Sequence, residues 1–295
     1  MQKTLAKILI NLIGAIPYKL RSELGSFLGR LVYLIPSRDK EIAKLQLKMC
    51  GFDQKLAKKV YAHLGKISLE TFNQKKALSD LSKFRINGFS EIEIYKETGG
   101  VLLTAHLGSW DLLAGVGIKL GFDIVAIGRE ARGGFSHAIL SELRKRLGVK
   151  TLWRKKSALI EIEDALREKK FIAALIDQDT KVKSFPVSFF GHNAATPSTL
   201  VDLAIKKEIP IFIALGISVG EIFEINVKNV SHLKTKEEIL STFHQALEEE
   251  IRKAPEQWVW VHKRWRTNEI GVRRSGKEYF QWLKDQTSNI TVKNL

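Results

Sequence analysis

Apolar residues along the chain recur at two spacings, which alternate for most of its length. Short, mostly apolar runs are typical of buried strands, and segments with apolar residues three and four positions apart are typical of amphipathic helices. The expected strands are 84–88, 101–105, 121–127, 150–153, 171–176, 210–217 and 222–227. The expected helices are 23–35, 38–50, 54–69, 90–97, 135–147, 157–168, 199–207 and 237–253. This alternation predicts an α/β fold in one domain, 1–295, with a mixed, mostly parallel sheet flanked by helices.

The first 17 residues add a hydrophobic segment in front of this pattern. Leu5 to Ile16 is apolar except for Lys7 and Asn11, and as a helix it would cover about 18 Å, well short of the roughly 30 Å hydrocarbon core of a bilayer. We therefore expect 1–17 to lie in the membrane interface as an anchoring helix. The alternative is a helix that packs on the domain. The following basic residues, which we expect to face anionic headgroups, are Lys19, Arg21, Arg30 and Arg38.

The composition of the C-terminal segment bears on its order, and the numbers of cysteines and histidines bear on disulfides and metal sites. Segment 268–295 is rich in polar residues, and we expect a tail that is loosely ordered in part. Cys50 is the only cysteine, which excludes an intrachain disulfide and any site with several cysteine ligands. The histidines show no paired metal spacing, so we expect no metal and no other cofactor.

A formal net charge of +16 indicates a negatively charged partner surface. The basic residues form separate clusters near aromatic or apolar residues, at 55–59, 129–132, 144–146 and 263–274. This distribution favours a membrane face or a phosphate pocket over a nucleic-acid arm, and no helix-turn-helix, zinc-finger or aromatic RNA-binding signature is present. We expect no nucleic-acid partner.

The segment His106-Leu107-Gly108-Ser109-Trp110-Asp111 stands where the strand 101–105 meets a predicted helix, with Ser109 suited to the N-cap. An imidazole and a carboxylate at this spacing suit proton transfer, because Asp111 would fix the tautomer of the His106 ring and offset the charge of the imidazolium. The structural alternative is that Asp111 complements the helix dipole and His106 is a hydrogen-bonded strand end. Ser109 lacks the second glycine of a nucleophile elbow, so we do not expect it to be a nucleophile.

Three further stretches follow this motif: Asp177-Gln178-Asp179, then Phe185 to Gly191 with Ala195-Thr196-Pro197, and then Pro255 to Thr267. Together, and in this order, the four stretches resemble the motifs of the lipid A biosynthesis acyltransferases, the late lauroyl and myristoyl transferases. That family lies within the His-x-x-x-x-Asp/Glu glycerolipid acyltransferase superfamily. The resemblance runs from about the first helix to Thr267. Two departures are Asp111, where hexa-acylating enzymes usually carry Glu, and 129–133, which replaces an Arg-x-x-x-Asn stretch.

The resemblance implies a glycerol-3-phosphate acyltransferase-like fold and an O-acyltransferase. A fatty acyl group would move from an acyl thioester to a hydroxyl of a lipid acceptor such as a lipid A precursor, with His106 as general base and Asp111 as its partner. Acyl-carrier protein is the favoured donor and coenzyme A the alternative. The implied location is the cytoplasmic face of the bacterial inner membrane, among anionic lipids. Alternatives are the same fold acting on a phospholipid, glycolipid or aminolipid, or a catalytically silent, basic membrane-binding protein.

The resemblance also implies substrate-binding residues. Arg144 best matches the arginine of the family's second motif, and Arg129 and Arg146 are neighbours that could take its place; the alternative is a solvated helix face. Asp179, with Asp177 near it, matches an acidic position after a strand and could instead cap a turn. Since His106 follows one strand and these aspartates another, we expect them to project into one crevice.

The remaining candidate residues lie in two segments of the chain. Arg264, together with His262 and Trp265, is expected to meet headgroups or substrate, although aromatic residues in this segment are also typical of core packing. His192 and Asn193 are expected in a loop.

Overall fold

The computed structural model describes residues 1–131, 133–155 and 157–293. Its helices are α1 (Gln2–Ala15), α2 (Tyr18–Leu34), α3 (Arg38–Met49), α4 (Leu56–Glu70), α5 (Gln74–Ala77), α6 (Phe89–Glu93), α7 (Trp110–Lys119), α8 (Gly134–Arg146), α9 (Ala158–Arg167), α10 (Thr199–Lys206), α11 (Lys236–Lys253) and α12 (Gly276–Lys293). Its strands are β1 (Phe84–Asn87), β2 (Gly100–Thr104), β3 (Ile124–Gly128), β4 (Lys150–Trp153), β5 (Phe171–Leu175), β6 (Ser184–Phe189), β7 (His192–Pro197), β8 (Ile211–Val219) and β9 (Ile222–Asn229). Single 3-10 turns lie at η1 (Thr71–Asn73), η2 (Leu81–Lys83) and η3 (Pro255–Gln257).

Seven of the strands form one sheet in the order β1-β9-β8-β2-β5-β3-β4. Every neighbouring pair is parallel except β8 and β9, which form an antiparallel hairpin. The predicted α/β fold with a mixed, mostly parallel sheet is therefore confirmed. In such a sheet, the carboxyl ends of adjacent parallel strands share one edge, where a site can form.

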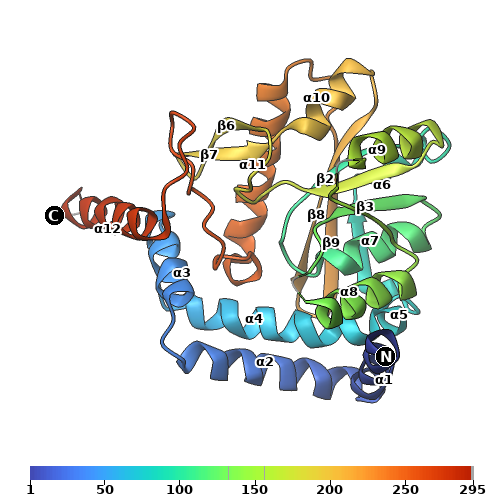
Figure 1. Cartoon of the computed structure of the whole chain (residues 1–295), viewed down its shortest axis with the longest axis horizontal. Coiled ribbons are helices and arrows are strands. Elements are labelled where there is room, and N and C mark those ends of the chain that lie inside the picture. Colours follow the sequence, from blue (N-terminus) through green and yellow to red (C-terminus); the bar gives the residue numbers. More distant parts are fainter. Residues whose placement is uncertain (132, 156, 294–295) are drawn as a thin grey trace.

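Helices cover both faces of the sheet (Figure 1). Successive strand residues point to opposite faces: Val101 and Leu103 of β2 pack into a core that includes residues of α9, α10 and α11, whereas Leu102 packs into a second core with α6. The α7 helix contributes Val116 to a third cluster on the same side as α6. Because both faces are covered, the central strands are almost wholly apolar, as parallel sheets require.

The N-terminal segment is a helix, α1, and its Ala6 and Ile10 are fully buried, whereas Leu5, Ile8 and Leu12 are exposed. No helix in the described part of the chain has both the length and the apolar character needed to cross a bilayer. The expectation that Arg21 faces headgroups is wrong: this side chain is buried, and its Nη1 donates to the carbonyls of Gly14 and Ile16 at 3.1 and 2.9 Å. Arg21 thus closes the turn between α1 and α2.

Two segments differ from the sequence-based expectation. The region after Thr267 is not simply a loose tail, because α12 packs against α3 and buries Tyr279 and Leu283 completely. His192 is not in a loop but begins β7, which pairs antiparallel with β6 as a separate two-stranded sheet. The turn between β6 and β7 holds Phe190 and Gly191, both with positive φ (50° and 73°), as tight hairpins require.

Candidate active site

His106 and Asp177 meet just beyond the ends of two neighbouring strands. In the parallel pairing of β2 with β5, Thr104 lies opposite Leu175, so His106 and Asp177 each stand two residues further along. The His106 Nδ1 lies 2.8 Å from the Asp177 Oδ1, and the His106 backbone N–H donates to Oδ2 at 3.0 Å. The expected proximity of His106 to an aspartate after the neighbouring strand is confirmed, whereas a shared crevice is not, because Asp177 is only 1% exposed.

Asp177 is held as an ionised carboxylate by its surroundings. It is only 1% exposed, and the Trp258 indole N–H also donates to Oδ2, at 2.9 Å. Burial would raise the pKa of this carboxyl, but the His106 ring and the donated hydrogen bonds outweigh burial and lower this pKa to about 2. A carboxylate in this position fixes Nδ1 as the protonated ring nitrogen.

The other ring nitrogen of His106 remains available for chemistry. Nε2 has no hydrogen-bond partner among the residues that the structure describes, and the side chain is 24% exposed. The Trp110 ring packs edge-on against the imidazole with a centroid distance of 5.1 Å. His106 therefore combines an anchored Nδ1 with a reachable Nε2, which is the arrangement of a general base.

Asp111 does not hold the His106 ring, so that part of the prediction is wrong. Its carboxylate accepts from the Arg144 Nε at 3.0 Å, and both side chains are largely buried. Asp111 lies in the first turn of α7, where the helix directs it towards α8 rather than back to the strand end. The carboxylate five residues after His106 thus fixes a guanidinium, and the one that serves the imidazole comes from β5.

An apolar pocket lies next to Trp110, the ring that contacts His106. It has a volume of about 90 Å³ and lies between the sheet and α6 and α7, with the small side chains Ala126, Ala173 and Ala214 in its wall. Three polar side chains also line it: Thr104, Asp111 and Arg144. Trp110 lines the pocket as well, so the ring that touches His106 is part of the wall.

Two buried polar atoms in this pocket lack a partner among the described residues, namely Thr104 Oγ1 and Arg144 Nη1. Buried polar groups are rarely left without a hydrogen bond. An apolar chain with a polar end group would satisfy both features, filling the apolar part and accepting hydrogen bonds from these donors.

The other two predicted arginines are not gathered with Arg144. Arg146 bonds to Glu142 of its own helix, at 3.1 Å, and lines a separate hollow between α1 and α8. Arg129 is exposed in the segment after β3, and Arg132, in the same predicted cluster, lies outside the described residues. Among the three candidates, Arg144 is the one that the fold brings to the pocket.

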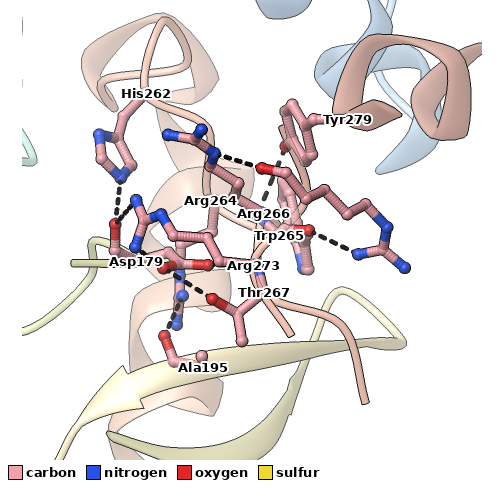
Figure 2. Close-up of polar contacts among 10 residues, drawn as sticks. Asp179, Ala195, His262, Arg264, Trp265, Arg266, Thr267, Arg273 and Tyr279 are labelled. Carbon is pink, nitrogen blue, oxygen red and sulfur yellow. Dashed lines mark hydrogen bonds and ion pairs between the residues drawn. The ribbon is translucent and has the colours of Figure 1, made fainter. Parts of the chain in front are cut away.

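Asp179 and Arg264 bond to other segments of the protein, as Figure 2 shows. Asp179 is 1% exposed; its carboxylate accepts from Arg273 Nη1, at 2.7 Å, and from the backbone and hydroxyl of Thr267. Arg264 is fully buried and donates to the Ala195 carbonyl and to the Thr196 hydroxyl. The expectation that these two residues contact substrate or headgroups is wrong, because both side chains are buried and their hydrogen bonds go to other parts of the protein.

Ser109 is the N-cap residue of α7 as predicted, but its hydroxyl makes no capping bond. Instead, Ser109 Oγ accepts from Gln74 Nε2 at 3.1 Å. Within the described part of the chain, no group of three or more His, Cys, Asp and Glu side chains is arranged to hold a metal ion.

Sequence reasoning missed the roles of Asp177 and Trp258. Asp177 had a usable signal, because it directly follows a buried strand and precedes a second aspartate. Trp258 lies in the motif stretch 255–267, but nothing in that stretch shows that its indole bonds to Asp177, 81 residues away in the sequence.

Residues 3–267 match the sequence model of a family described as bacterial lipid A biosynthesis acyltransferase. The match covers the His106 segment, the β5–β7 segment and the segment that carries Trp258. No curated protein matches the chain closely enough to add a relative.

Proposed function

Because the chain belongs to the bacterial lipid A biosynthesis acyltransferase family, we propose that it moves a fatty acyl group from an acyl thioester to a hydroxyl of a lipid A precursor, with His106 as general base. The acyltransferase activity follows from the family; the base, the donor and the acceptor hydroxyl are the proposal. The observation that carries it is the His106–Asp177 pair, with Nδ1 bonded to a buried carboxylate and Nε2 open.

In this mechanism, His106 Nε2 removes the proton from the acceptor hydroxyl as its oxygen attacks the thioester carbonyl. The tetrahedral intermediate then collapses, the carbon–sulfur bond breaks, and the imidazolium returns the proton to the departing thiolate. Asp177 orients the ring and stabilises the positive charge that the ring carries between these two steps. The products are the acylated lipid and the free thiol, and no acyl-enzyme is required.

The apolar pocket that Trp110 lines is our candidate site for the acyl chain. Its apolar wall would bury methylene groups, each contributing about 0.8 kcal/mol. Arg144, fixed by Asp111 and with an unpaired Nη1, can donate to the carbonyl oxygen as negative charge develops there. In this proposal Asp111 acts through Arg144.

We favour acyl-carrier protein as the thioester donor and the cytoplasmic face of the inner membrane as the location. The net charge of +16 supports both, because it favours an acidic protein donor and anionic lipids alike. Acyl-coenzyme A is the other donor to be compared.

The test is the His106→Ala variant, assayed with acyl-carrier-protein thioester or acyl-coenzyme A and a purified lipid A precursor. We expect the rate to fall by about 10²–10⁴, and mass spectrometry of the wild-type product to show the gain of one acyl group. His232→Ala, which changes an exposed histidine, is the control and should retain activity. If His106→Ala folds and turns over at a wild-type rate, His106 is not the base.

A further inference from the structure

The α2 helix turns small residues towards the protein and large apolar residues outward, which is the reverse of an amphipathic helix in a water-soluble protein. Its buried positions are Arg21, Gly25 and Gly29, so the face towards the protein carries two glycines. A Cβ added to Gly25 would lie 2.5 Å from the Gly65 carbonyl oxygen of α4, and one added to Gly29 would meet the backbone of Tyr61. The two helices therefore approach closely through glycine, which is typical of helices packed within lipid.

The outward face of α2 carries its large apolar side chains. At intervals of three and four residues they form one stripe of exposed side chains, from 38% to 67% accessible: Leu20, Leu24, Phe27, Leu28, Leu31 and Leu34. Val32 and Ile35 widen the stripe and are 52% and 61% exposed. Figure 1 shows α2 at the edge of the molecule, with α4 on its inner side. An exposed apolar face of this extent marks a surface that contacts a membrane or a protein.

A basic groove runs along one flank of this stripe. It has a volume of about 490 Å³ and is lined by Ser26 and Arg30 of α2 and by Lys58, Lys59 and Lys66 of α4, with one acidic residue, Glu256. Arg30, Lys58 and Lys59 are exposed. His63 also lines the groove, and its buried Nε2 has no partner among the described residues. Cations beside an apolar stripe are placed as they would be at the phosphate level of a bilayer.

We propose that α2 is the principal membrane-binding element of this protein. The helix lies parallel to an anionic bilayer, its leucines and Phe27 enter the acyl layer, and the basic groove binds lipid phosphates. The exposed stripe of α1, which is Leu5, Ile8 and Leu12, adds a second apolar contact before the turn into α2. The inference deepens the proposed function, which requires a lipid acceptor, but vesicle binding itself does not depend on turnover.

An anionic bilayer fits this surface better than a second copy of the chain. Each copy carries a formal net charge of +16, and pairing two α2 stripes would bring two basic grooves together. Like charges at close range oppose such pairing, whereas anionic headgroups attract them.

The experiment is sedimentation with vesicles of phosphatidylcholine, with and without phosphatidylglycerol. The double variant Leu31→Glu/Ile35→Glu should bind anionic vesicles at least about tenfold more weakly, because it removes two apolar contacts and adds negative charge. The control is Leu159→Glu/Ile160→Glu on α9, where a Leu and an Ile of similar exposure (51% and 64%) undergo the same change. The control should bind within about twofold of wild type, as expected for scattered surface residues.

A second pair of variants tests the groove. Arg30→Glu/Lys59→Glu should remove the preference for anionic over neutral vesicles, whereas Arg167→Glu/Lys206→Glu, on α9 and α10, should keep it. The proposal is overturned if Leu31→Glu/Ile35→Glu binds vesicles like wild type. It is also overturned if ultracentrifugation shows a wild-type dimer that this variant dissociates, since the stripe would then be a self-association surface.

Two assays, turnover in detergent and vesicle binding, separate the membrane-binding role of α2 from the catalytic role of His106. With an acceptor dispersed in detergent, Leu31→Glu/Ile35→Glu should retain turnover, because the substitutions lie outside the His106 site. His106→Ala should lose turnover and still bind vesicles. Thermal unfolding of each variant checks that a loss of binding does not come from a loss of folding.

Discussion

At the scale of single residues, the Asp177 carboxylate serves three donors at once: the His106 ring, the His106 backbone and the Trp258 indole. Asp177→Asn removes the charge and offers the ring an amide, which cannot hold Nδ1 as the donor in the same way. We expect kcat to fall by about 10²–10⁴ with little change in KM, because Asp177 stabilises the imidazolium that forms during the reaction and does not bind the substrates. Initial rates across donor and acceptor concentrations measure both constants.

Asp111→Asn is the matched comparison, since it makes the same chemical change in the other carboxylate. Asp111 bonds to Arg144 and not to the imidazole, so we expect a smaller loss of kcat, because the substitution loosens Arg144 but leaves its charge and the His106–Asp177 pair in place. If Asp111→Asn abolished kcat while Asp177→Asn stayed near wild type, the assignment of Asp177 as the residue that positions His106 would be wrong.

At the scale of elements, the α2–α4 pair depends on the absence of side chains where the helices touch. A Cβ added to Gly65 would lie 2.2 Å from the Gly25 carbonyl oxygen and 2.8 Å from the Gly29 nitrogen. Gly65→Val should therefore push the helices apart and lower the free energy of unfolding by about 1–3 kcal/mol or more. Urea unfolding followed by circular dichroism measures the change.

The control for this substitution is Gly276→Val at the start of α12. A Cβ there would meet only Arg38 Nη1, at 3.8 Å, so we expect a change of less than about 1 kcal/mol. Equal destabilisation of the two variants would show that the β-branched side chain, and not the close contact of α2 with α4, accounts for the loss.

At the scale of the whole molecule, local patterns predicted the fold better than the site. Strands such as 101–105 and 171–176 could be located from the sequence because burial on both faces makes them continuously apolar. Asp177 could be expected near His106 because both follow buried strands, but which carboxylate bonds to the ring depends on the register between β2 and β5, which tertiary packing sets. The same applies to Asp179 and Arg264, whose charges suggested a ligand although each is buried and bonds to protein groups from distant segments.

The C-terminal helix α12 and the helix α2 are two elements whose packing could not be predicted from the sequence. Two buried hydrophobic residues, Tyr279 and Leu283, anchor α12 to the rest of the protein. They are too few to change the polar character of the segment, on which the prediction of a loose tail rested. In α2, the amphipathic spacing predicted a helix correctly, but the apolar stripe faces outward because the glycines face α4. Periodicity shows that a helix has two faces, and only the packing shows which one is buried.

Two buried histidines, His63 and His244, and the partly buried His262 give the whole molecule a predictable response to acid. Burial lowers the pKa of His63 to about 4, that of His244 to about 3 and that of His262 to about 4. In the unfolded chain these groups titrate near pH 6.5, so below that pH the unfolded state binds protons that the folded state does not. Stability is therefore lost as the pH falls from 6.5 towards 4, by up to about 1.4 kcal/mol per pH unit for each histidine.

The measurement is urea unfolding between pH 5 and pH 7.5. The His244 ring bonds to the Ser188 carbonyl through Nδ1 and to Thr196 Oγ1 and Arg264 Nη2 through Nε2. His244→Gln can keep one donor and one acceptor for these partners, but it does not titrate. Its plot of stability against pH should be less steep than that of wild type, whereas exposed His232→Gln should leave the slope unchanged. Asp177 adds to acid sensitivity only below about pH 4, because its pKa is lowered from 3.8 to about 2. The window above pH 5 therefore isolates the histidines, and a wild-type stability that does not change across it would contradict their assignment as neutral in the folded protein.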